Sequence, residues 1–232
     1  MACVIGIDIG TQGTKAGLFA EDGTLLAQAF QMSALRREPP NIVEEDPERQ
    51  YNSVCQTIQT CLDAAKADPG SIAGVGIDGQ MAGVIGVGRD GRHVTPYDSW
   101  LDTRCAPYIE FMERTAGEEI TAIAGCPPSI NHGPKKLWWR NERKSVYDRI
   151  HAFVQPGAYA AMRLCGLDGA QAYIDTTYLH FSGFADTHKA RWNTELAKWL
   201  ELDPAKLPRI VRPEEVVGQV TQSGAKASGL LE

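Results

Sequence analysis

The chain has 232 residues, of which 43% are hydrophobic and 22% are charged, a composition typical of a folded globular protein and unlike a fibrous or disordered one. Its net charge of −6 argues against a general nucleic-acid binder, because such proteins need a basic surface. The sequence contains no run of about 20 apolar residues and begins without a charged signal region, and its six cysteines lack a CxxC spacing, so we expect a cytoplasmic protein without a membrane partner.

Three short strands are predicted at the start of the chain. Apolar residues fill 3–9, 14–20 and 25–27, and tight turns separate these stretches at 10–13 and at Asp22-Gly23. An Asp-Gly pair favours a hairpin because both turn positions tolerate positive φ. We therefore expect a three-stranded antiparallel meander as the first part of a mixed sheet flanked by helices.

A helix and a fourth strand are predicted next. Asp46 can cap a helix that has Pro47 in its first turn, and we expect the preceding Glu44 and Glu45 to be solvated. One apolar face then recurs at helical spacing, at Tyr51, Val54, Cys55, Ile58, Leu62 and Ala65. The apolar stretch 72–77 predicts the fourth strand.

The rest of the chain alternates between helices and loops. Helices are predicted around 104–115, 135–141 and 157–164, with a short strand at 152–154. The tail, 219–232, has no apolar periodicity, so we expect no closing element there. These patterns predict one compact α/β domain over 1–232.

Asp8 and the turn that follows it form the first candidate site. A carboxylate at a strand end can hold Mg²⁺ directly or through water, and a tight glycine turn exposes backbone N–H groups and the Thr11 hydroxyl to a phosphate. Lys15 adds a positive charge. An ordinary hairpin with an exposed Asp explains the same residues. The turn is neither a Walker A loop nor a dinucleotide turn, because a strand follows it.

Two further segments are candidates for ligand contacts. Asp78 and Gln80 follow the fourth strand, where α/β sheets place ligands, and they could bond hydroxyl groups, although a glycine-permitted turn is an equal alternative. Trp100 offers an indole face for a sugar, and Asp102 and Arg104 could fix its hydroxyls. The alternative there is a buried Trp with a capping Asp and a surface Arg.

In combination these segments resemble the FGGY family of carbohydrate kinases, its xylulokinase members most closely. The resemblance covers nearly all 232 residues and corresponds to the amino-terminal one of the family's two domains. Six motifs in the family's order carry it: the segment 6–15, Glu44-Glu45-Asp46-Pro47, Gly79-Gln80-Met81, Trp100-Leu101-Asp102-Thr103-Arg104, Gly133-Pro134-Lys135, and Asp175-Thr176-Thr177 ahead of Arg191-Trp192.

The resemblance implies an actin-like, ribonuclease-H-like α/β fold in which two domains close on a cleft. It implies a sugar held mainly by the first domain and ATP mainly by the second, with Mg²⁺ between them. By position, the residues facing nucleotide phosphates and metal would be Asp8, Gly10, Thr11, Gln12, Gly13 and Lys15, with Asp8 at the metal. The residues at the sugar would be Gln80, Met81, Ala82, Trp100, Asp102 and Arg104.

Two departures from the family pattern bear on the substrate and on the base. Xylulokinases usually carry His where this chain has Ala82, and glycerol kinases carry Arg-Glu at Met81-Ala82, which argues against glycerol. The family's general base is an Asp in a later glycine-rich turn, whereas the only Asp after residue 200 is Asp203, in a Leu-Asp-Pro context. We therefore expect the base, and the carboxyl-terminal nucleotide-binding domain, beyond Glu232.

The expected function is ATP-dependent phosphorylation of a hydroxyl group on a small ketose such as xylulose, or on a polyol. The expected partner is that small molecule, with a homodimer as an option, and the isolated chain should be inactive. A non-catalytic sugar-binding or regulatory module and a sugar-independent actin-like ATPase are the alternatives. A ribonuclease-H-like nuclease would need clustered carboxylates and a basic groove, which the sequence does not offer.

Overall fold

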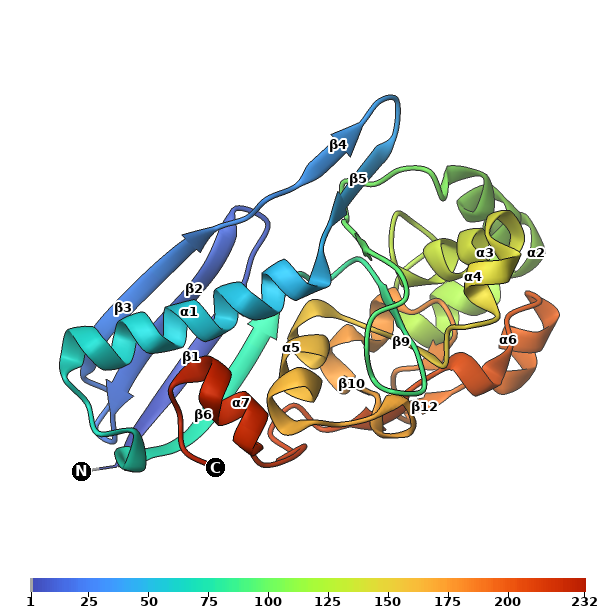
Figure 1. Cartoon of the computed structure of the whole chain (residues 1–232). Helices are drawn as coiled ribbons and strands as arrows, with labels where there is room; N and C mark the ends of the chain where they lie inside the picture. The colour runs from blue at the N-terminus through green and yellow to red at the C-terminus, as the bar shows by residue number, and fades with distance from the viewer. Residues whose placement is uncertain (1) are drawn as a thin grey trace.

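The computed structural model describes residues 2–232, and its centre is a four-stranded sheet of order β3-β2-β1-β6 (Figure 1). The strands are β1 (Cys3–Ile9), β2 (Gly13–Ala20), β3 (Leu25–Met32) and β6 (Ile72–Gly79). Strands β1, β2 and β3 pair antiparallel and β6 runs parallel to β1, which confirms the predicted meander and the mixed sheet. Strand β3 is longer than predicted, since it continues to Met32.

One face of this sheet carries the main hydrophobic core. Side chains alternate along β1, so that Ile5, Ile7 and Ile9 are buried while Asp8 is on the opposite, open face. Helices α1 (Pro47–Ala65) and α5 (Pro156–Cys165) cover the buried face, as Figure 1 shows. The predicted start of α1 is confirmed, because the Asp46 side chain accepts a hydrogen bond from the Glu48 amide at 2.9 Å.

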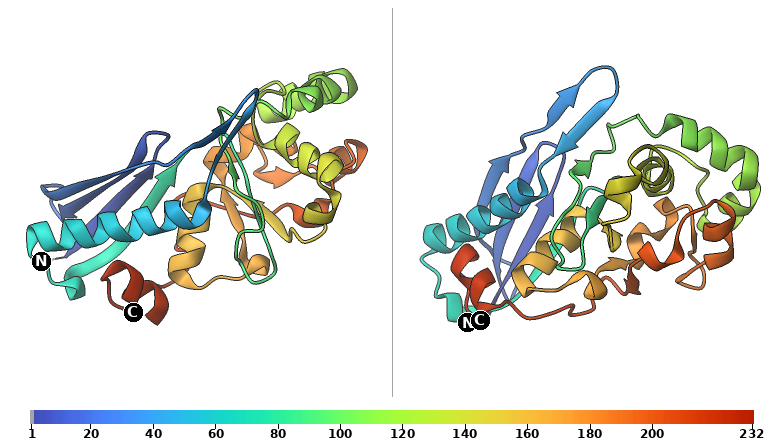
Figure 2. Two further views of the ribbon diagram at one scale, coloured as in Figure 1. Left: turned by 45° about the horizontal axis from the view of Figure 1, so that its top comes forward. Right: turned by 45° about the vertical axis from the view of Figure 1, so that its right-hand side comes forward.

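A second, three-stranded sheet of order β4-β5-β8 projects away from the first (Figure 2). It consists of β4 (Arg36–Glu38), β5 (Ile42–Glu45) and β8 (Tyr97–Asp98). The expectation that Glu44 and Glu45 are solvated is wrong, since both are buried. Strand β5 pairs with β8, a strand more than fifty residues away, and this pairing removes both carboxylates from water.

The second half of the described chain packs around a separate core that includes Met112, Ile120 and Phe153. Its elements are β7 (Ile85–Val87), α2 (Ala106–Ala124), α3 (His132–Glu142), α4 (Lys144–Tyr147) and β9 (Ala152–Val154). The three predicted helices are confirmed as α2, α3 and α5 and the predicted strand as β9, although α2 begins later and runs further than expected. Strands β7 and β9 pair antiparallel.

The remaining elements are short. They are η1 (Pro69–Ser71), η2 (Gly169–Gln171), β10 (Tyr173–Asp175), η3 (Thr176–Phe181), β11 (Ala185–Asp186), β12 (Arg191–Trp192), α6 (Thr194–Trp199), η4 (Pro204–Lys206), β13 (Arg209–Val211) and α7 (Gln222–Ser228). None of the helices within residues 2–232 combines the length and apolar character needed to cross a bilayer. All six cysteines are free thiols.

Helix α7 corrects the expectation that the tail has no closing element. The Thr221 side chain accepts a hydrogen bond from the Gly224 amide and caps the helix. Gly224 lies so close to α5 that an added Cβ would stand 2.2 Å from the Leu164 carbonyl oxygen. The helix packs on α1 and α5 through small residues, and for this reason it has no apolar periodicity to detect.

Candidate functional site

The site begins where β1 and β6 end side by side. Their parallel register pairs Asp8 with Asp78 on the open face of the sheet, at the carboxyl edge where α/β folds bind ligands. The Asp8 side chain is 52% exposed, and its charged neighbour is the Lys15 ammonium at 3.9 Å on β2. A row of charged groups therefore crosses three strands at this edge.

The turn between β1 and β2 is tight and depends on glycine. The Gly10 amide donates to the Gly13 carbonyl at 3.0 Å, which closes the turn. A Cβ at Gly13 would lie 2.3 Å from the Gln31 carbonyl oxygen on β3, so a larger residue would separate the two strands. Gln12 is exposed at the tip, and Thr11 is partly buried beside it.

Thr11 links this turn to both of the other predicted segments. The Trp100 indole Nε1 donates to the Thr11 hydroxyl at 2.9 Å, and that hydroxyl donates to Gln80 Oε1 at 3.3 Å. Gln80 is buried, and its Nε2 finds no hydrogen-bond acceptor within residues 2–232. The structure thus brings together three segments that the sequence separates by 69 and 89 residues.

His132 holds the loop after β6 from behind and was not identified from the sequence. Its Nε2 lies 2.7 Å from the Met81 carbonyl oxygen, and the side chain is fully buried at the start of α3. Burial, together with the nearby Lys136 charge, lowers the pKa of His132 to about 3. The imidazole is therefore neutral, with the proton on Nε2, where it donates to the Met81 carbonyl.

Two tyrosines support the same loop. The Tyr178 hydroxyl is 3.2 Å from both Asp78 Oδ1 and the Gly79 carbonyl oxygen, and the Tyr97 hydroxyl donates to the Ala82 carbonyl at 3.4 Å. Tyr178 directly follows the Asp-Thr-Thr motif, which is the one sequence signal that could have identified it. The loop is therefore fixed by buried groups, while its Met81 side chain is exposed.

The segment from Trp100 to Arg104 divides between the surface and the interior. Trp100 is 48% exposed, whereas Asp102 is 1% exposed and the Arg104 side chain 9%. Asp102 Oδ2 accepts from the Val43 amide at 2.8 Å, and Oδ1 accepts from Arg104 Nε at 3.0 Å. The structure brings Trp100 to Thr11 and turns Asp102 and Arg104 away into the protein.

Arg104 is the centre of a buried ionic cluster, which we call the Arg104 network. One guanidinium nitrogen lies 2.6 Å from Glu44 and 2.7 Å from Asp98. The network consists of Glu44, Asp98, Asp102, Arg104, Trp139 and Lys135. Burial raises the pKa of Asp98 to about 7, against the opposing pull of the Arg104 and Lys135 charges.

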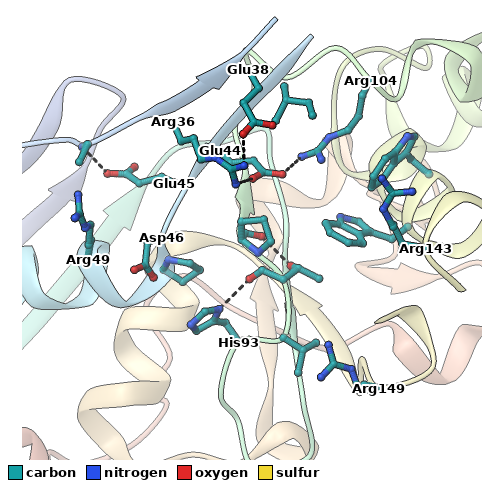
Figure 3. Close-up of a pocket in the computed structure, with 18 residues that line it drawn as sticks. Arg36, Glu38, Glu44, Glu45, Asp46, Arg49, His93, Arg104, Arg143 and Arg149 are labelled. Atoms are coloured by element: carbon teal, nitrogen blue, oxygen red, sulfur yellow. Dashed lines mark hydrogen bonds and ion pairs between the residues drawn. The ribbon is translucent and has the colours of Figure 1, made fainter. Parts of the chain in front are cut away.

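The largest cavity lies apart from the strand-end site. It has a volume of about 860 Å³ and is lined by the β4–β5 hairpin, the first turn of α1 and the end of α3 (Figure 3). Of the site residues predicted from the sequence, only Arg104 lines it. Within residues 2–232 no group of three or more His, Cys, Asp or Glu residues could hold a metal ion.

Comparisons with known proteins place these features in context. The model of the N-terminal domain of the FGGY family of carbohydrate kinases matches residues 3–232. A xylulose kinase of Staphylococcus xylosus is 26% identical over 234 residues, which cover 99% of this chain and 47% of that protein. Two solved structures from Lactobacillus acidophilus, a gluconate kinase and a ligand-bound xylulose kinase, match with a TM-score of 0.89 at 26% and 25% identity, covering 99% of this chain and 46% of each of theirs.

The chain therefore spans about half the length of the known proteins that it matches. Its mixed sheet with flanking helices has the fold of the actin-like ATPases, as the sequence predicted. The match extends from the first strand through the last helix, so the strand-end site lies wholly inside it. The chain belongs to the FGGY family of carbohydrate kinases and matches the N-terminal domain of that family.

Proposed function

We propose that the chain is the sugar-binding half of an enzyme that transfers a phosphoryl group from ATP to a hydroxyl group of a small sugar. Membership of the FGGY family supports this proposal. The observation that carries it is the hydrogen-bonded series from Trp100 through Thr11 to Gln80, which joins a phosphate-type turn to a loop with an unused amide donor. Phosphoryl transfer needs the acceptor and the phosphate in contact, and this series puts both surfaces side by side.

Asp8 is the residue that we propose for Mg²⁺ and the nucleotide phosphates, with Gly10, Thr11, Gln12, Gly13 and Lys15 around them. Its carboxylate is half exposed and has only the Lys15 ammonium, at 3.9 Å, as a charged neighbour, so its oxygens are accessible to a hydrated cation. Mg²⁺, when bound, neutralises charge on the transferred phosphoryl group. The tight turn holds its backbone amides close to that carboxylate, since a Cβ at Gly10 would stand 3.6 Å from Asp8 Oδ2.

The sugar contacts are proposed for Gln80, Met81, Ala82 and Trp100. Gln80 Nε2 is a buried donor without an acceptor, which a substrate hydroxyl would satisfy. The indole of Trp100 has its N–H occupied by Thr11 and its exposed face free for the C–H face of a sugar. Asp102 and Arg104 act from behind, by holding the segment that carries Trp100.

The substrate that we propose is a small ketose, with a pentulose such as xylulose ahead of a polyol. Several relatives are named as xylulose kinases, and one structural relative is named as a gluconate kinase. Ala82 removes one hydrogen-bonding side chain from the pocket, so a substrate with a smaller or less polar group at that point is favoured. The general base and the nucleotide-binding domain are proposed to lie outside this chain.

A cytoplasmic location and a homodimer complete the proposal. Six free thiols, four of them buried, fit a reducing compartment. Strand β3 is an edge strand with no charged residue, and it exposes Leu25, Phe30 and Met32, so it lacks the usual protection against pairing with another strand. A Phe30→Lys variant should remain monomeric in light scattering if β3 forms the dimer contact.

The direct test is ADP formation from Mg²⁺-ATP over a panel of ketopentoses, ketohexoses and polyols. It compares this chain with a protein extended by the nucleotide-binding domain of the family. We expect the extended protein alone to respond, and to one class of sugar. ADP formation that ignores every sugar would instead favour an actin-like ATPase, and sugar binding without ADP formation would favour a non-catalytic module.

A further inference from the structure

The 860 Å³ cavity is built from four parts of the chain and lies behind the strand-end site. The β4–β5 hairpin, the first turn of α1, the loop 93–96 and the stretch from α3 to Arg149 form its walls. Figure 3 shows many charged side chains pointing into it from opposite sides. The cavity is large enough for a small metabolite, and the proposed phosphate turn contributes no residue to it.

The carboxylates of the cavity are all engaged within the protein. Glu44 pairs with Arg104 and Arg36, and Glu38 pairs with Arg36. Glu45 accepts hydrogen bonds from the Ala34 amide at 3.2 Å and from Gln50 Nε2 at 2.8 Å. Asp46 caps α1 through the Glu48 amide. No lining carboxylate therefore lacks a donor.

Three of the five lining arginines have no such partner. Within residues 2–232, Arg49, Arg143 and Arg149 have no carboxylate oxygen within 4 Å. Arg143 donates to the Glu142 carbonyl at 2.8 Å and lies 5.3 Å from the centre of the Trp138 ring, which leaves most of its N–H groups unused. The unused hydrogen-bonding capacity of the cavity is thus cationic.

We propose that this cavity binds a small molecule carrying two phosphoryl groups, at a site separate from the proposed catalytic one. Guanidinium groups bind phosphate through two parallel N–H donors, a geometry that lysine cannot provide. Figure 3 places Arg49 on one side and Arg143 and Arg149 on the other, so one phosphoryl group on each side satisfies the arrangement. A single phosphate reaches only one side.

Occupancy of this site acts on the sugar loop through Arg104. That residue lines the cavity and also fixes Asp102, whose carboxylate holds the backbone of the segment carrying Trp100. A ligand that draws Arg36 or Arg104 from Glu44 changes the Arg104 network without touching the sugar. The site is therefore suited to an effector.

The test is titration calorimetry of this chain with inorganic pyrophosphate, without sugar or nucleotide. We expect one binding site, with affinity reduced at least fivefold in Arg49→Gln, Arg143→Gln and Arg149→Gln. These side chains are exposed, so circular dichroism melts should be unchanged. The matched control is Arg114→Gln, which removes an exposed arginine of α2 that does not line the cavity and should keep the wild-type affinity.

A Thr11→Val variant separates this site from the phosphate turn. Unchanged pyrophosphate affinity in Thr11→Val supports the cavity. A loss in Thr11→Val with no loss in the arginine variants overturns the proposal, because pyrophosphate then binds at the turn. An equal loss in Arg114→Gln, or no binding at millimolar pyrophosphate, overturns it as well. Because no sugar or ATP is present, none of these results depends on the proposed kinase activity.

Discussion

The strand-end site and the Arg104 network lie back to back and use their charged groups in opposite ways. At the strand ends, Asp8 and Trp100 are half exposed, and Gln80 has an unused donor. In the network, Asp102 and Arg104 are buried and fully paired. Unpaired capacity at an exposed edge is available to a ligand, whereas paired buried charges hold the fold. One five-residue motif thus supplies both a contact residue and its support.

The largest expected effect is the loss of turnover in Asp8→Asn of the extended enzyme. Removing the carboxylate proposed for the cation should lower kcat by roughly 10³-fold to 10⁴-fold, equivalent to about 4–5 kcal/mol, with little change in sugar affinity. Steady-state ADP release measures it. Asp63→Asn, an exposed aspartate on α1, is the control. Wild-type turnover in Asp8→Asn would show that this edge is not where phosphate reacts.

Arg104→Met tests the supporting side of the comparison. It leaves the Glu44, Asp98 and Asp102 carboxylates buried without their cation, so the free energy of unfolding should fall by about 3–5 kcal/mol. Urea denaturation at pH 7 measures it. Arg36→Met, at an exposed member of the same group, should cost less than about 0.5 kcal/mol. Equal losses in the two variants would contradict a special role for the buried guanidinium.

Two adjacent buried lysines sharpen the comparison. Lys135 Nζ donates to the Ser99 and Asp102 carbonyls at 2.9 and 2.8 Å, whereas Lys136 Nζ has no hydrogen-bond partner within residues 2–232. Lys135→Met should therefore destabilise the protein by about 2 kcal/mol, because two buried carbonyls lose their donor. Lys136→Met should stabilise it at pH 7 by a similar amount, because an unpaired buried charge is removed.

The same pair predicts a pH dependence. Burial lowers the pKa of Lys136 to about 7, below its unfolded value of 10.5, so the unfolded state binds the extra proton between these values. Stability should rise from pH 7 to 10.5, and the contribution of Lys136 should be constant at its lowest value below pH 7. Denaturation across this window should show the rise in wild type and lose it in Lys136→Met. An unaltered rise in Lys136→Met would assign it to another group.

The smallest expected effect is that of Trp100→Phe. The ring face is kept, but the hydrogen bond to Thr11 is lost, so sugar affinity should fall about threefold to tenfold. Calorimetry with xylulose measures this change. No change at all would mean that the link between turn and loop does not position the sugar contact.

Local signals predicted most of the fold, and long-range pairing determined the rest. The Asp22-Gly23 turn and the Asp46-Pro47 helix start are visible in the sequence, and both elements formed as predicted. The burial of Glu44 depends on β5 pairing with β8, which no local pattern reveals. Arg104 is buried for the same reason, since its partners come from both of these strands.

In the candidate site, the sequence predicted the exposed residues better than the supporting ones. Asp8, Thr11, Gln80 and Trp100 lie at one edge, where the motifs placed them, although their roles stay predictions. His132 was missed because its role depends on a contact with the Met81 carbonyl, 51 residues earlier in the chain. A backbone acceptor of this kind leaves no mark in a motif.

The most direct test of the central claim compares two equally exposed tryptophans. Trp100 is 48% exposed at the strand-end site, and Trp199 is 54% exposed at the end of α6. Titration of xylulose into wild type, Trp100→Ala and Trp199→Ala should show affinity reduced more than tenfold in Trp100→Ala and unchanged in Trp199→Ala. Equal affinities in all three proteins would contradict the assignment of the sugar to this edge of the sheet.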